Sequence, residues 1–208
     1  LPMLNPDGTE RFQRRTALNI DMNRDFLKAE SVETQHFKRI QKEIKADFSF
    51  NLHDQNPYYS VGYEAFPTAI AFLAPSYNYE CAINTCRKKA MQVTAFMSEM
   101  LEEFAPNLIA KYSDEHEPRS YGDCVQQTGS STILIESGFY PNDPEKQEIR
   151  KLNFVAILMA MASISQNDYS EIDIEKYHQI PQNKSLFHDV IFRNVEIEQE
   201  MGSFRADI

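Results

Sequence analysis

Four side chains that could take part in chemistry lie at the ends of stretches that are predicted to be strands: Asn23, Arg24, His53 and Glu136. The three stretches cover residues 17–22, 47–54 and 132–135. Ligands of open α/β sheets bind in the crevice beyond the carboxyl ends of the strands, so these side chains should meet at one edge of the sheet. An amide, a guanidinium, an imidazole and a carboxylate in one place favour metal-assisted hydrolysis of a substrate with a negatively charged end.

Each of these side chains also has an ordinary structural explanation. A single histidine at the end of a strand, such as His53, is more often a structural residue than a metal ligand. A glutamate directly after a buried strand is less common, because a buried carboxylate is costly unless it is paired or used. Arg14, Arg15 and Arg24 could each be surface arginines. Only the spacing between the residues can decide between the two explanations.

The elements that must position these residues alternate between amphipathic helices and short apolar strands, which is typical of a layered α/β fold. Helices are predicted over residues 31–46, 82–104 and 143–164, and a further strand over 68–74. Ser31 and Asp143 are suitable N-caps, and Pro144 suits the first helical position. The third helix is apolar on nearly every side at its centre, so it should be buried. Residues 111–131 are predicted to be a polar loop whose length indicates a functional role.

Composition excludes some classes of partner. The formal net charge is -10, which argues against nucleic acid because its phosphates would be repelled. The longest apolar run covers residues 154–162, far too short for a membrane span. Three cysteines do not make a disulfide framework. We therefore expect an ordinary globular protein that binds neither nucleic acid nor the interior of a membrane.

Three motifs together resemble one enzyme family. Asn5-Pro6-Asp7-Gly8 is followed by Arg14 and then by Asp21-Met22-Asn23-Arg24-Asp25-Phe26. This pattern resembles the signature of zinc carboxypeptidases of the carboxypeptidase A/B type, with substitutions at Thr16, Asn19, Met22 and Asp25. Leu52-His53-Asp54 looks like the strand end that carries the family's last zinc-binding histidine, and Ile135-Glu136-Ser137 looks like the strand end that carries its catalytic glutamate. In this order the motifs cover residues 1–165.

The resemblance implies a fold, an activity and a role for each residue. The fold would be α/β, with a mixed, mostly parallel sheet flanked by helices, carboxypeptidase-like and incomplete at its N-terminus. The activity would be that of a metallocarboxypeptidase with one zinc ion in the full-length protein, acting on peptides that carry a free C-terminal carboxylate. His53 would bind zinc, and Glu136 would be the general base for a zinc-activated water. Arg14 would stabilise the oxyanion and contact the substrate, while Asn23 and Arg24 would bind its terminal carboxylate.

The chain departs from the family at two places. The family's first two zinc ligands come from a His-x-x-Glu motif upstream of the Asn-Pro-Asp-Gly turn, and no histidine here is followed by Glu three residues later. We therefore expect a fragment that is cut at both ends, inactive, and without zinc or with only weakly bound zinc. The family's mobile tyrosine has no clear counterpart, although Tyr112 and Tyr121 flank its place. His116, Glu117 and Arg119 could shape the substrate pocket instead, or form a solvated charged loop.

The chain is predicted to divide at residue 167. Residues 1–167 would form a partial zinc carboxypeptidase catalytic domain, and 168–208 a linker with the start of a truncated C-terminal β module. Within the second part, residues 187–197 alternate like a strand that has no partner after it. Other functions stay open: a cell-wall peptide amidase with the same machinery, a non-catalytic module that binds peptide carboxylates, or a structural domain whose four polar residues lie far apart.

Overall fold

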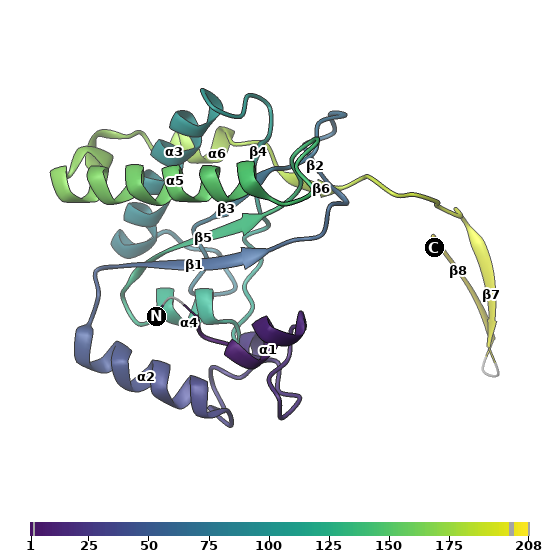
Figure 1. The fold of residues 1–208 in the computed structure, drawn as a ribbon, viewed down its shortest axis with the longest axis horizontal. Coiled ribbons are helices and arrows are strands. Elements are labelled where there is room, and N and C mark those ends of the chain that lie inside the picture. Colours follow the sequence, from purple (N-terminus) through teal and green to yellow (C-terminus); the bar gives the residue numbers. More distant parts are fainter. Residues whose placement is uncertain (2, 200–201, 208) are drawn as a thin grey trace.

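A four-stranded sheet lies at the centre of the computed structural model, which describes residues 1, 3–199 and 202–207 (Figure 1). Its strand order is β1-β5-β3-β4. The strands are β1 Phe48–Asp54, β3 Ile70–Leu73, β4 Ile109–Lys111 and β5 Ser131–Ser137. β1 runs parallel to β5 and β3 runs parallel to β4, while β3 and β5 are antiparallel. The expected mixed, mostly parallel sheet flanked by helices is confirmed.

Helices cover both faces of this sheet (Figure 1). One layer contains α3 Thr85–Glu102, α5 Gln147–Gln166, η2 Asp168–Glu171 and α6 Glu175–Gln179. The other contains α1 Pro6–Arg11, η1 Met22–Arg24, α2 Val32–Ile44 and α4 Tyr121–Gln127. Successive side chains of a strand point to opposite faces. Phe50 and Ile133 therefore pack beneath α3 and α5, while His53 and Glu136 face the second layer.

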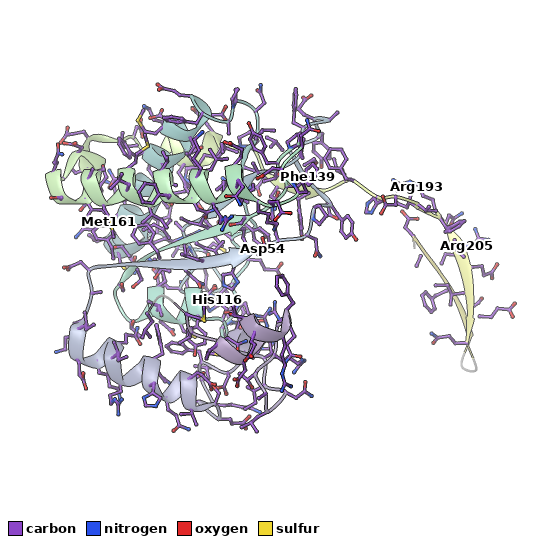
Figure 2. All side chains as sticks on the ribbon, in the orientation of Figure 1. Asp54, His116, Phe139, Met161, Arg193 and Arg205 are labelled. Atoms are coloured by element: carbon purple, nitrogen blue, oxygen red, sulfur yellow. The ribbon has the colours of Figure 1, made fainter. Side chains whose placement is uncertain are left out.

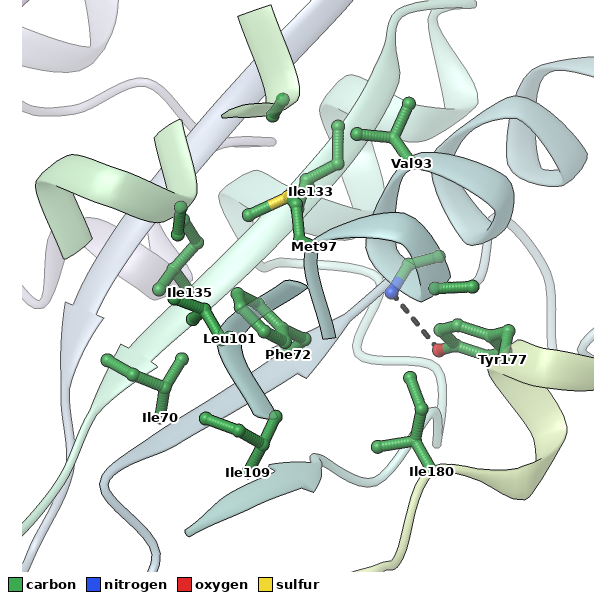
Figure 3. Close-up of a cluster of buried hydrophobic side chains, with 14 of the residues drawn as sticks. Ile70, Phe72, Val93, Met97, Leu101, Ile109, Ile133, Ile135, Tyr177 and Ile180 are labelled. Atoms are coloured by element: carbon green, nitrogen blue, oxygen red, sulfur yellow. Dashed lines mark hydrogen bonds between the residues drawn. The ribbon is translucent and has the colours of Figure 1, made fainter. Parts of the chain in front are cut away.

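The main core lies between the sheet and the first helical layer. Its fully buried members from the strands and α3 include Ile70, Phe72, Met97, Leu101, Ile133 and Ile135 (Figure 3). Tyr177 of α6 closes this core, and its hydroxyl accepts a hydrogen bond from the Ala74 amide at 3.1 Å, the dashed line in Figure 3. These buried side chains form the packed core that supports the strands and their ends.

The segment that follows α5 packs onto this body. Tyr169, Tyr177 and Ile180 are buried in the main core. β6 Asn183–Ser185 pairs antiparallel with β2 Tyr59–Val61. The expected polar connector is therefore a packed part of the structure as far as residue 185, and the division into domains at residue 167 stays a prediction.

Two short helices replace expected extended or turn segments near the N-terminus. The stretch 17–22 is not a strand: Asp21 caps η1 by accepting a hydrogen bond from the Asn23 amide at 3.1 Å. The expected turn at residues 5–8 is the start of α1, where the Asn5 side chain accepts from the Gly8 amide at 3.0 Å. Asn and Asp serve both as turn residues and as helix caps, so the sequence pattern alone did not separate the two structures.

The expected structureless loop at residues 111–131 also contains a helix. Ser120 caps α4 by accepting a hydrogen bond from the Asp123 amide at 3.2 Å. Tyr121, Cys124 and Val125 of α4 pack with Met22 and Phe26 in a second small core. In the sequence, the charged residues before this helix made the whole segment resemble a polar loop, so its short apolar face was not recognised.

The helix α5 begins later than expected and is not buried on all sides. The N-cap of α5 is Lys146 and not the expected Asp143, and Pro144 lies before the helix. The Asp143 carboxylate still accepts hydrogen bonds from the amides of residues 147, 148 and 149 at 2.7, 2.9 and 3.1 Å, so it satisfies donors of the first turn. Phe154, Leu158 and Met161 are 67%, 55% and 57% exposed, so the prediction of a buried helix was wrong. Figure 2 labels Met161 on α5. Only one side of the helix packs against the core. The amino-acid composition of a helix does not show how many of its sides other elements cover.

The C-terminal residues form a separate hairpin (Figure 1). β7 Val195–Gln199 pairs antiparallel with β8 Gly202–Ala206, at the end of an extended segment. The expected strand at 187–197 therefore begins later, and the prediction that it lacks a partner was wrong. None of the described helices is long and apolar enough to cross a membrane.

Candidate functional site

His53 and Glu136 lie next to each other at the ends of two parallel strands. In the register of β1 and β5 their Cα atoms are paired, one step before the last pair, Asp54 and Ser137. Residues that pair in this way point to the same face of a sheet. The structure thus places His53 and Glu136 side by side on the face of the sheet that α4 contacts. This pair does not lie far apart, as the structural-domain alternative requires.

Glu136 has the electrostatics of a group that exchanges protons near neutral pH. Burial raises the pKa of its carboxyl from 4.5 to about 7; the nearby charge of Asp54 acts in the same direction, and that of Arg14 opposes it. A general base works best when its pKa is close to the operating pH. Perturbed carboxyls of this kind cluster at functional sites.

The surroundings of His53 favour its neutral form. Burial lowers its pKa from 6.5, the positive charges of Arg14 and Arg24 lower it further, and Asp21 acts in the opposite direction. A neutral imidazole keeps a nitrogen lone pair that can bind a metal ion or accept a proton. The two strand-end residues therefore present a neutral donor beside a carboxyl that titrates near pH 7.

Arg14 reaches the site from the loop that follows α1. Its Nε atom donates to Asp21 Oδ2 at 2.9 Å, and its side chain is 58% exposed. The Asn5 side chain donates to the Arg14 carbonyl at 3.1 Å, which ties the loop to the cap of α1. The positive charge of Arg14 acts to lower the pKa of both Glu136 and His53. A partly solvated cation thus lies near both strand-end residues.

Asn23 and Arg24 are presented by η1 and held by the loop before α4. The Asn23 side-chain oxygen accepts from the Tyr121 amide at 2.9 Å. Arg24 Nη1 donates to the Asn23 carbonyl at 2.7 Å, and Arg24 Nε pairs with Glu117 Oε2 at 3.2 Å. The side-chain NH₂ group of Asn23 is therefore available to another hydrogen-bond partner, while Arg24 already contacts two acceptors, the Asn23 carbonyl and Glu117.

A cleft of ≈ 850 Å³ opens beside these groups. Arg14, Asn23 and His53 line it, together with Asp21 and Asn51. Arg24 and Glu136 are not part of its lining and lie next to it. Two other hollows, of ≈ 600 and ≈ 370 Å³, run along α2 and β1 and contain none of the five predicted site residues. The cleft beside His53 is therefore the candidate substrate site.

The side chains that the structure describes include the types that can bind a metal ion. Among them, no group of three or more His, Cys, Asp or Glu side chains is arranged to hold an ion. A catalytic zinc normally takes three protein ligands and keeps one open position. The imidazole of His53 is of a type that zinc accepts as a ligand.

Sequence patterns did not predict that Asp21 pairs with Arg14 or that Glu117 pairs with Arg24. In the sequence, Asp21 and Glu117 differ from other loop carboxylates only in having charged neighbours, and such neighbours are too common in loops to predict a pairing. Of the two tyrosines near the family's mobile position, Tyr121 is tied down, because its buried hydroxyl donates to Thr34 Oγ1 at 2.6 Å. Tyr112 lies near Glu136, Arg14 and Tyr59, and burial raises its pKa.

Comparison with known proteins supports the fold. No protein-family model matches this chain, and no curated protein matches its sequence. The product-bound ectoine utilization protein EutE (DoeB) from Ruegeria pomeroyi is similar in structure, with 12% identity and a TM-score of 0.54 over 77% of this chain and 44% of that one. A metallo-carboxypeptidase from Burkholderia cenocepacia is similar with 17% identity and a TM-score of 0.52 over 81% of this chain and 44% of that one.

These two likenesses concern the fold, since identities this low do not carry function. The chain spans less than half the length of either similar structure. The chain therefore has a carboxypeptidase-like fold, with a mixed, mostly parallel sheet between helices.

Proposed function

We propose that this chain carries the general base and the carboxylate-binding residues of a zinc-dependent metallocarboxypeptidase. The single observation that supports this most is the pairing of His53 and Glu136 at adjacent strand ends, beside a cleft that Arg14 and Asn23 line. The carboxypeptidase-like fold agrees with it. The substrate class is a peptide with a free C-terminal carboxylate.

Each side chain has a distinct role in this proposal. Glu136, with a pKa of about 7, takes a proton from the attacking water and passes it to the leaving amine. Arg14 stabilises the oxyanion, where the loss of one donor typically costs about 2.7–4 kcal/mol. Asn23 and Arg24 bind the terminal carboxylate, and an internal peptide bond has no such group to offer. The enzyme is therefore an exopeptidase.

His53 would supply one ligand to the zinc ion of this proposed enzyme. When bound, zinc makes hydroxide available at neutral pH and polarises the scissile carbonyl. His53 would be one of its three protein ligands, which requires the neutral imidazole that burial and the nearby arginines favour. The described residues alone should therefore bind zinc weakly.

The test uses the complete natural gene product with zinc in the buffer. The wild-type protein should release the last residue of a synthetic peptide, and Glu136→Gln should abolish release while peptide and zinc binding persist. Glu115→Gln is the matched control, because Glu115 is an exposed carboxylate on the loop before α4. Full activity of Glu136→Gln would refute the assignment of the base.

A non-catalytic module that binds peptide carboxylates is the second candidate. The observation that favours it is the cleft lined by Arg14 and Asn23, together with the lack, among the described residues, of a group of three or more side chains arranged to hold a metal ion. In the same assay this candidate predicts that the peptide binds and stays intact, even when the gene product is saturated with zinc. Release of the C-terminal residue excludes it.

A further inference from the structure

Glu117 joins two arginines through one carboxylate. Its Oε1 atom accepts from Arg119 Nε at 2.8 Å and from the Arg119 amide at 3.1 Å. Its Oε2 atom accepts from Arg119 Nη2 at 2.8 Å and pairs with Arg24 Nε at 3.2 Å. The hydrogen bonds from Arg119 and the charge of Arg24 hold the pKa of Glu117 at about 2. The carboxylate therefore stays ionised at every pH at which the protein would work.

The backbone beneath Glu117 is fixed by a buried anchor. Asp123 Oδ1 accepts from the Glu117 amide at 3.2 Å and contacts His116 Nδ1 at 3.0 Å. Asp123 Oδ2 accepts from the Ser120 hydroxyl at 2.5 Å. The side chains of His116 and Asp123 are only 6% and 11% exposed, and Figure 2 labels His116 close to α4. Glu117 thus stands on a loop that the fold holds rigidly, although its own side chain reaches the surface.

This arrangement leaves donors and charge for one further carboxylate. Arg24 uses Nε for Glu117 and one proton of Nη1 for the Asn23 carbonyl. A guanidinium has five N–H donors, so the Nη2 protons and the second Nη1 proton stay free for a ligand. Arg24 and Arg119 carry two positive charges against one negative charge on Glu117. The nearby Arg14 is already matched by Asp21.

We propose that Glu117 is a positioning residue that fixes the guanidinium of Arg24 for binding the terminal carboxylate of the substrate. This inference rests on the role given to Arg24 in the proposed function. Glu117 grips the Nε side of the guanidinium, and the substrate binds the opposite, Nη end. The planar fork of arginine gives a bidentate contact only when its plane is correctly set.

The contacts of Glu117 indicate that it holds Arg24 in place for the substrate and does not compete with the substrate for Arg24. A carboxylate that merely occupied the place of the substrate would have to move away when the substrate arrives. Glu117 is held by two 2.8 Å bonds from the fork of Arg119 and by that residue's own amide, so it remains where it is. Its removal should therefore weaken carboxylate binding, whereas removal of a competitor would strengthen it.

The experiment measures ligand binding to the 208-residue chain and needs neither zinc nor turnover. The probes are N-acetyl-alanyl-phenylalanine as the free acid and the same compound as its C-terminal amide. Both are titrated while the Nε–Hε NMR signal of Arg24 is followed. The ratio of the two affinities isolates the carboxylate contact, because a general loss of structure would weaken both probes alike.

Glu117→Gln should lower the affinity for the acid by about tenfold and leave that for the amide unchanged. The Arg24 Nε–Hε signal should broaden or exchange faster without ligand. Glu115→Gln removes the same charge from an exposed position on the same loop, so it should behave as the wild type. If Glu117→Gln does not fold, Arg119→Lys replaces the fork with a point charge and should give a smaller loss of the same kind.

The outcomes separate this inference from the proposed function. If the wild type prefers the acid and Glu117→Gln binds it equally or more tightly, Glu117 does not position Arg24 and the proposed function stands. If the wild type binds acid and amide alike, the carboxylate site itself is refuted, and the inference falls with it. An acid preference that is lost in Glu117→Gln and kept in Glu115→Gln supports both.

Discussion

Replacement of Glu136 by glutamine should stabilise the fold at alkaline pH and leave it unchanged in acid. Burial, with help from Asp54 and against Arg14, raises the pKa of this carboxyl from 4.5 to about 7. A carboxyl with a higher pKa in the folded protein than in the unfolded chain holds its proton more tightly when folded. Its contribution to stability is therefore complete below pH 4.5 and is lost as the pH rises through about 7.

The size of the effect follows from the two pKa values. Each pH unit between 4.5 and about 7 is worth about 1.4 kcal/mol. Over this interval the ionised carboxylate costs the fold at most about 3.5 kcal/mol, and the partial exposure of Glu136 makes the real cost smaller. Glutamine has the same shape without the charge. The variant should exceed the wild type by up to this amount at about pH 8.5 and match it at about pH 4.5.

Urea unfolding followed by circular dichroism at both pH values measures this difference. Glu115→Gln, at an exposed site, is the control and should show no comparable gain at alkaline pH. A Glu136→Gln variant that is no more stable than the wild type at alkaline pH would contradict the raised pKa. A gain that is equal at both pH values would contradict it as well, and the assignment of Glu136 as the base would lose its physical ground.

Three further predictions concern the site and the core. Arg14→Gln removes the charge that opposes the rise in the pKa of Glu136, so the pKa should move further up, and an unchanged carboxyl titration by NMR would place Arg14 elsewhere. Leu101→Ala, at a fully buried position, should lower the free energy of unfolding in urea by about 2–5 kcal/mol. Leu158→Ala, on the exposed side of α5, should change it by less than about 0.5 kcal/mol. Equal losses in the two variants would contradict the packing described. Tyr177→Phe leaves the Ala74 amide without its partner and should cost about 1–3 kcal/mol, while Tyr63→Phe at an exposed ring should cost nothing measurable.

The longer elements could be predicted because their patterns are strong. α2 begins after the expected cap Ser31, and β1 and β5 lie within two residues of the expected ranges. Their alternation of apolar residues reports which side meets the core. The meeting of His53 and Glu136 followed from the rule that parallel strands end at the same edge.

The short elements and the supports of the arginines could not be predicted in the same way. α1, η1 and α4 are too short to show a helical period, and their caps resemble turn signals. The pairing of Glu117 with Arg24 joins residues 93 positions apart in the sequence, and nothing local marks it. The exposed side of α5 depends on what covers the helix, which is a property of the whole fold.

Mass spectrometry of a peptide incubated with the complete natural gene product and zinc tests the central claim most directly. One sample contains the peptide with a free C-terminus, and the other contains the same peptide as its C-terminal amide. We predict a product one residue shorter from the free acid and an intact amide. Equal shortening of both peptides, cleavage within the peptide, or an untouched free acid would contradict the account.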